Sequence, residues 1–180
     1  MNELRFARII SAVAHPFVLT PLTVALATGN LRWTAIIAGV TLLPIIAVLI
    51  WNVRRGVWSD FDVSRRDQRS GLYWLAIPLL LLAAFLIDAP PAFTRGMLAV
   101  GVILVIGLAG NRFLKTSLHM MFGAYSAVIL LRLSPWSALV MLPVVLALAW
   151  SRWRLKRHTL PEITFGTLLG AAAGLYVILV

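Results

Sequence analysis

The chain has 180 residues, of which 61% are hydrophobic and 12% charged, and its net charge is +10. A soluble domain of this length cannot bury so much apolar surface, so lipid must form part of its solvent. The positive charge lies in short segments between apolar runs, which favours anionic membrane lipids and phosphate groups as partners rather than nucleic acid. The absence of cysteine excludes disulfides and thiolate chemistry.

Apolar runs predict the helices, because a membrane-spanning helix needs about 20 apolar residues. The first run, 9–28, is followed at once by another, which favours a span over a signal sequence. In chain order the runs cover 9–28, 33–51, 72–87, 97–110, 118–131, 135–150 and 163–180, with a polar loop at 52–71. Some are short enough to be tilted, re-entrant or buried in the bundle. We therefore expect an all-α, polytopic transmembrane bundle of six to seven helices, forming a single domain over residues 1–180.

Most of the cations collect on one side of the predicted membrane. Seven crossings put the N-terminus, loop 52–71, turn 112–117 and loop 151–162 on one face. Of the 16 Lys and Arg residues, only Arg32, Arg95 and Arg132 fall on the other face. By the positive-inside rule, the crowded face is expected in the cytoplasm of a bacterial or archaeal plasma membrane.

Three polar clusters lie on this crowded face, and the one at 151–162 has the clearest spacing. On a helix, His158 and Glu162 would share a face, and the carboxylate would fix one imidazole nitrogen and leave the other as nucleophile or base. Arg152 and Ser151 could hold an oxyanion. The alternative is structural: Thr159-x-x-Glu162 is also a capping box, in which Glu162 only caps a helix.

The cluster at 112–119 predicts a helix start. Thr116 or Ser117 is expected as the N-cap, and the free N–H groups of a helix start favour a phosphate. His119, just inside that start, could protonate a leaving oxygen. The alternative is an ordinary capped helix with a histidine at the membrane interface.

The cluster at 59–69 alternates acidic and basic residues. Its cations could bind phosphate, or Asp60, Asp62 and Asp67 could hold magnesium bound to a diphosphate. The simplest interpretation is a solvated, salt-bridged loop.

Taken together, the clusters resemble the motifs of the type 2 phosphatidic acid phosphatases, membrane relatives of the vanadium haloperoxidases. Ser151-Arg152, five residues, His158, three residues and Glu162 is similar to the family's third motif, Ser-Arg-x5-His-x3-Asp. Thr116-Ser117-Leu118-His119 is similar to the second, Pro-Ser-Gly-His. Arg65 to Arg69 stands where the first motif, Lys-x6-Arg-Pro, is expected. The resemblance covers about 59–170.

The resemblance implies a role for each matching residue. His158 would be the nucleophile, Glu162 its orienting carboxylate and His119 the general acid. The implied phosphate ligands are Ser117, Ser151, Arg152 and Arg69, with Arg66 or Arg65 in place of the family lysine and Lys115 as a further cation. The chain departs from the family in having Glu162 for aspartate, Leu118 for glycine and Ser70 for proline.

The expected function is a lipid phosphate phosphatase that works through a phosphohistidine and needs no metal or other cofactor. Phosphatidic acid, phosphatidylglycerol phosphate and polyprenyl phosphates all fit a site that opens at the membrane surface. Two alternatives remain open. One is a non-catalytic membrane homologue or subunit that binds lipid head groups, and the other is a magnesium-dependent lipid diphosphate transferase.

Overall fold

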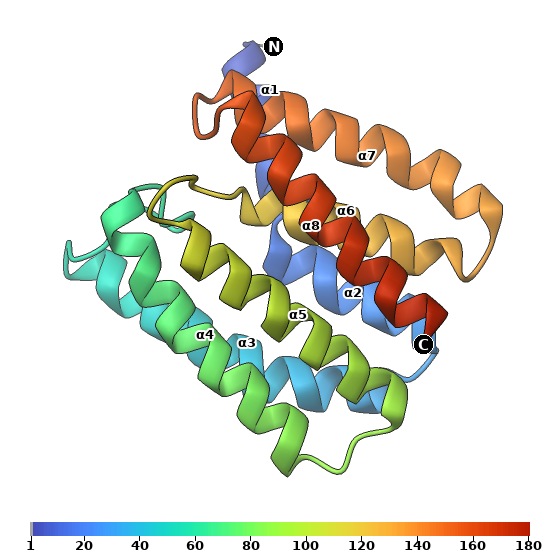
Figure 1. Ribbon diagram of the computed structural model, residues 1–180. Helices are drawn as coiled ribbons and strands as arrows, with labels where there is room; N and C mark the ends of the chain where they lie inside the picture. The colour runs from blue at the N-terminus through green and yellow to red at the C-terminus, as the bar shows by residue number, and fades with distance from the viewer. Residues whose placement is uncertain (1) are drawn as a thin grey trace. The chain divides into compact units, whose positions relative to one another are not determined.

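The structure is a computed structural model that describes residues 2–180, and within this range every regular element is an α-helix. Figure 1 shows them, and their bounds are α1 Glu3–Val13, α2 Pro16–Thr28, α3 Leu31–Arg54, α4 Arg66–Leu86, α5 Pro91–Gly110, α6 Leu118–Leu131, α7 Pro135–Arg154 and α8 Leu160–Leu179. The all-α prediction is confirmed. Five of the described helices are long and apolar enough to cross a membrane, or six if α1 and α2 count as one broken span.

The first apolar run is where the sequence prediction is wrong, because residues 9–28 do not form one helix. α1 begins at Glu3 and ends at Val13, and α2 starts at Pro16 with a bend of 46° between them. Pro16 has no N–H and its ring blocks the preceding turn, so it starts a helix rather than continuing one. His15 is extended and caps α2, its Nδ1 accepting from the N–H of Phe17 at 3.2 Å.

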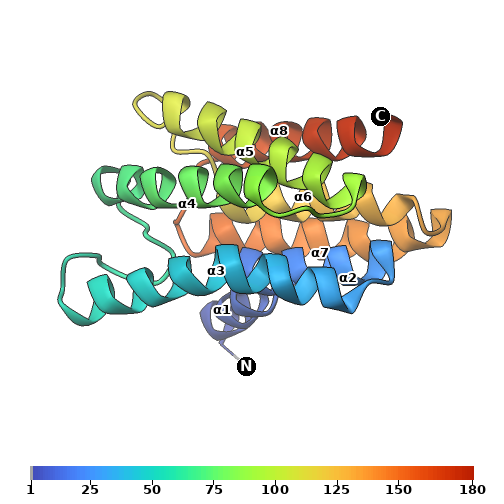
Figure 2. The same cartoon turned by 90° about the horizontal axis from the view of Figure 1, so that it is seen from below.

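The helices group into two compact units, which we describe separately. The first unit holds the described residues up to Asn30 together with Leu114–Val180, and the second holds Leu31–Phe113. In the first, α6 contacts α2, α7 and α8, and α1 packs on α7. In the second, α4 contacts both α3 and α5, and Figure 2 shows it between them. Because the helices fall into two compact units, the expectation that residues 1–180 form a single membrane domain stays a prediction.

Close packing of α6 against α8 organises the first unit (Figure 1). Gly166, Gly170 and Gly174 recur every four residues along α8 and face α6. A methyl group on Gly166 would lie 2.7 Å from the carbonyl oxygen of Ser117, and one on Gly170 would overlap the carbonyl oxygen of Met121. Small residues at this spacing let two helix backbones approach closely, as in the packing of helices in membranes. This contact fixes the start of α6 beside the start of α8.

Candidate functional site

His158 lies in the short connection between α7 and α8 and is 5% exposed. Its Nδ1 is 3.2 Å from Oε2 of Glu162 and 3.1 Å from the carbonyl oxygen of Lys115. A carbonyl oxygen and a carboxylate can only accept, so Nδ1 must carry a proton and donate it to them. In the neutral ring the lone pair then belongs to Nε2.

Glu162 has two roles at once, so the interpretations that the sequence left open are compatible. Its Oε2 accepts from the backbone N–H of Thr159 at 3.1 Å, which completes the capping box, and the same oxygen faces Nδ1 of His158. The expected geometry was different in one respect. α8 begins at Leu160, so His158 precedes the helix and does not share a helical face with Glu162.

The start of α6 is bonded to the α7–α8 connection. The N–H of Ser117 donates to the carbonyl oxygen of Glu162 at 3.2 Å, and Nζ of Lys115 donates to the carbonyl oxygen of Arg157 at 2.8 Å. With the contact between His158 and Lys115, these bonds bring the second and third predicted clusters together within one unit. The sequence motifs are about 40 residues apart, and the α6–α8 packing supplies their proximity.

Ser117 occupies the N-cap position of α6, as the sequence predicted, but its side chain makes no capping hydrogen bond. The residue is 0% exposed, and its Oγ has no hydrogen-bond partner among the described residues. A buried hydroxyl without a partner is costly, and such groups mark places where a ligand or water is expected. The hydroxyl and the first N–H groups of α6 form an arrangement suited to an anion.

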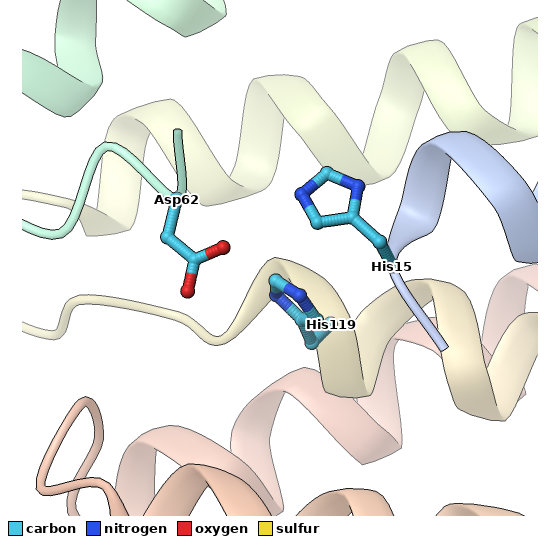
Figure 3. A group of neighbouring side chains, drawn as sticks. All are labelled: His15, Asp62 and His119. Carbon is cyan, nitrogen blue, oxygen red and sulfur yellow. The ribbon is translucent and has the colours of Figure 1, made fainter. Parts of the chain in front are cut away.

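His119, one residue inside α6, is 4% exposed and packs against a second histidine. The ring of His15 meets it edge to face, with centroids 4.9 Å apart and an interplanar angle of 87°. Figure 3 shows the two rings converging from the α1–α2 connection and from α6. The break between α1 and α2 places His15 at this position. A histidine inside an apolar run was the signal for it, but its neighbour could not be read from the sequence.

Arg152 and Ser151 are both buried in the last turns of α7, and both bond to α1. Nη1 of Arg152 donates to Oγ of Ser11 at 2.7 Å, and Oγ of Ser151 donates to the carbonyl oxygen of Ala7 at 2.7 Å. The hydroxyl hydrogen of Ser151 is therefore engaged in a hydrogen bond to α1, and the role of Ser151 as a phosphate ligand stays a prediction. The contribution of Ser11 had no signal in the sequence, because a serine near an apolar run fits many environments.

The cations of the first predicted cluster belong to the second unit. The loop prediction 52–71 is wrong at its end, because α4 begins at Arg66 and carries Asp67, Gln68 and Arg69 in its first turn. Arg65 pairs with Asp67 at 3.0 Å, with both side chains more than 60% exposed. Arg66 donates to the carbonyl oxygens of Arg112 and Phe113 at 3.4 and 3.5 Å, and Arg69 is 1% exposed. Phosphate binding by these three arginines stays a prediction.

Asp60 organises the loop that precedes α4. Its Oδ1 accepts from the N–H of Asp62 at 2.9 Å, the N–H of Ser64 at 3.3 Å and the hydroxyl of Ser64 at 2.9 Å. These bonds form an Asx turn that supports Val63 at a positive φ of 45°. The carboxylate thus has a structural role in the loop.

Comparison with models of known protein families, with characterised proteins and with solved structures finds no match. The resemblance to the type 2 phosphatidic acid phosphatases therefore rests on the motif residues alone.

Proposed function

We propose that this protein is an integral membrane lipid phosphate phosphatase that resembles the type 2 phosphatidic acid phosphatases and acts through a phosphohistidine. The observation that supports this best is the setting of His158. Two acceptors hold its Nδ1, so the lone pair falls on Nε2, and the connection that carries it is bonded to the start of α6. A histidine oriented by a carboxylate in this way is the arrangement that nucleophilic catalysis requires.

The proposed reaction has two steps. In the first, Nε2 of His158 attacks phosphorus, the bond to the lipid alkoxide breaks, and His119 gives its proton to the leaving oxygen. In the second, His119 takes a proton from water, the hydroxide attacks the phosphohistidine, and phosphate leaves while His158 regains its lone pair. Glu162 stabilises the positive charge that develops on the imidazole, because it faces Nδ1.

Phosphate would be held by groups of the first unit at the start of α6 and the end of α7. The hydroxyl of Ser117 can donate to a phosphoryl oxygen, and the helix start adds its dipole. Arg152, in the last turn of α7, offers a planar guanidinium, and Lys115 offers a further cation.

The outer surfaces of the helices support a membrane location. Large apolar side chains such as Leu86, Phe85 and Trp136 are more than 70% exposed, and at most 44% of any candidate span is buried. Such surfaces are stable in lipid and not in water. A substrate with a hydrocarbon tail and a phosphate head therefore fits best, with the motif face in the cytoplasm as the distribution of cations suggests.

The test is phosphate release from a panel of lipid phosphates by purified protein in detergent with EDTA, comparing the wild type with His158→Ala. Ser137→Ala is the matched control, because it removes a hydroxyl from α7 whose partners are Leu130 and Ser134. Release by the wild type and the control, lost in His158→Ala, supports the proposal, as does acid-labile labelling of the protein by a radioactive substrate. No release from any lipid favours a non-catalytic head-group-binding homologue. Release that EDTA abolishes favours magnesium chemistry.

A further inference from the structure

α1 has three distinct faces along its 11 residues. One is buried against α7 and contains Ala7 and Ser11, which are 0% and 6% exposed. A second is an exposed apolar stripe, Phe6, Ile9 and Val13, whose exposures are 44%, 45% and 68%. The third is exposed and cationic, with Arg5 and Arg8. The free surface of α1 is thus amphipathic, with the apolar and cationic stripes side by side.

The contacts of α1 show that it lies obliquely to α7. Near its start, Glu3 pairs with Arg154 at 2.9 Å, and just past its end Ala14 belongs to the same buried apolar cluster as Leu148. These partners are six residues apart on α7, a rise of about 9 Å, whereas Glu3 and Ala14 are eleven residues apart on their own segment, a rise of about 16 Å. Only part of the length of α1 is therefore directed along α7, and the remainder runs across it.

We propose that α1 is an interfacial helix that docks on an anionic lipid surface, with its apolar stripe in the head-group region and Arg5 and Arg8 on lipid phosphates. The inference rests on the membrane location argued under the proposed function, but not on the phosphatase chemistry. It replaces the expectation that residues 9–13 form the first part of a span.

Lipid is the occupant that fits this surface. Amphipathic helices with cationic and aromatic residues lie about 5–10 Å into the boundary between head groups and acyl chains, and the neighbouring apolar and cationic stripes of α1 suit that layer. An apolar groove of about 480 Å³ between α1 and α7, lined by Glu3, Phe6, Ile10, Ala147 and Trp150, continues the apolar surface. Arg5 and Arg8 add electrostatic attraction to an anionic surface.

Docking of α1 would also bear on the candidate site, since the buried face of the helix holds Arg152. The bond from Arg152 to Ser11 and the bond from Ser151 to Ala7 both end on α1. A lipid surface that fixes α1 therefore fixes the guanidinium proposed to bind phosphate.

The absence of cysteine allows a direct test, because single cysteine variants can carry a spin label without a background signal. The labels go on the apolar stripe by Phe6→Cys, Ile9→Cys and Val13→Cys, and on the neighbouring cationic side by Arg5→Cys, Arg8→Cys and Ala12→Cys. In vesicles of phosphatidylcholine with phosphatidylglycerol, stripe labels should collide with oxygen and be shielded from a water-soluble nickel chelate. Labels at 5, 8 and 12 should show the reverse. A steady gain in depth from position 5 to position 13 would overturn the proposal in favour of a span.

Two further arms separate the possible failures. A label at Val102, exposed in the middle of α5, reports membrane insertion independently of where α1 lies. If it is deep while the α1 labels do not alternate, the interfacial role alone is wrong, and if it is open to the nickel chelate, the membrane location is wrong too. The label at position 9 should lie deeper in anionic than in neutral vesicles, and Arg5→Gln with Arg8→Gln should remove that difference. Equal depth in both vesicles would overturn the role of anionic lipid.

Discussion

Gly166→Ala should weaken the contact between α6 and α8, although alanine favours helices. The added methyl would lie 2.7 Å from the carbonyl oxygen of Ser117, and ordinary contact begins at 3.4 Å, so one backbone must move by about 0.7 Å. Overpacking of this kind costs about 1–3 kcal/mol, whereas replacing glycine within a helix gains about 1 kcal/mol. The net change in the free energy of unfolding should be a loss of about 0–2 kcal/mol.

The control is Gly39→Ala in α3, where no atom lies within 4 Å of the added methyl, so only the gain of about 1 kcal/mol applies. The two variants should therefore differ by about 1–3 kcal/mol. At roughly 2–4 °C per kcal/mol for a chain of this size, the melting temperature of Gly166→Ala in detergent should be about 2–12 °C below that of Gly39→Ala. Equal melting temperatures would show that α6 and α8 do not pack through this glycine, and the juxtaposition of Ser117 with Glu162 would then be unsupported.

Three further perturbations address the site and its surroundings. Glu162→Gln keeps an oxygen for the N–H of Thr159 but removes the charge opposite His158, so phosphate release should fall about 10–100-fold with little change in melting temperature; unchanged turnover would argue against the electrostatic role. Ser151→Ala removes the bond to Ala7 and should cost about 1 kcal/mol in thermal unfolding, and no cost would mean that this bond does not hold α1. Asp60→Ala should speed hydrogen exchange at the amides of Asp62 and Ser64, with or without magnesium; slower exchange on adding magnesium to the wild type would restore a metal role.

The apolar runs predicted the helices well, because hydrophobicity over about 20 residues decides which segments can be helical in lipid. The error at residues 9–28 has a local cause. Composition alone favours one helix there, and the break depends on Pro16 together with a capping bond from His15 that only the folded chain reveals. The start of α4 was placed too late because the prediction relied on apolar residues. The first turn of α4, Arg66 to Arg69, is polar and therefore gave no signal.

The candidate site was predictable only where its residues are close in sequence. The spacing of four suggested the contact between His158 and Glu162, but the structure forms it through the capping box at Thr159 and not through a shared helical face. The bond from Ser117 to Glu162 depends on the close packing at the glycines of α8. Their spacing is typical of a helix-packing motif, but it does not indicate which helix they contact. The bond from Arg152 to Ser11 joins positions 141 residues apart, and no spacing rule reaches so far.

Glutamate at position 162, where the motif that this chain resembles has aspartate, has a structural reason in this chain. A residue at the third helical position needs the longer arm of glutamate or glutamine to reach back to the N-cap N–H and form a capping box. Oε2 of Glu162 does this for Thr159 and still lies 3.2 Å from Nδ1 of His158. One oxygen therefore accepts from the N–H of the N-cap residue of α8 and also fixes the tautomer of His158. Glutamate at this position lets the helix that carries the carboxylate be capped without giving up the histidine contact.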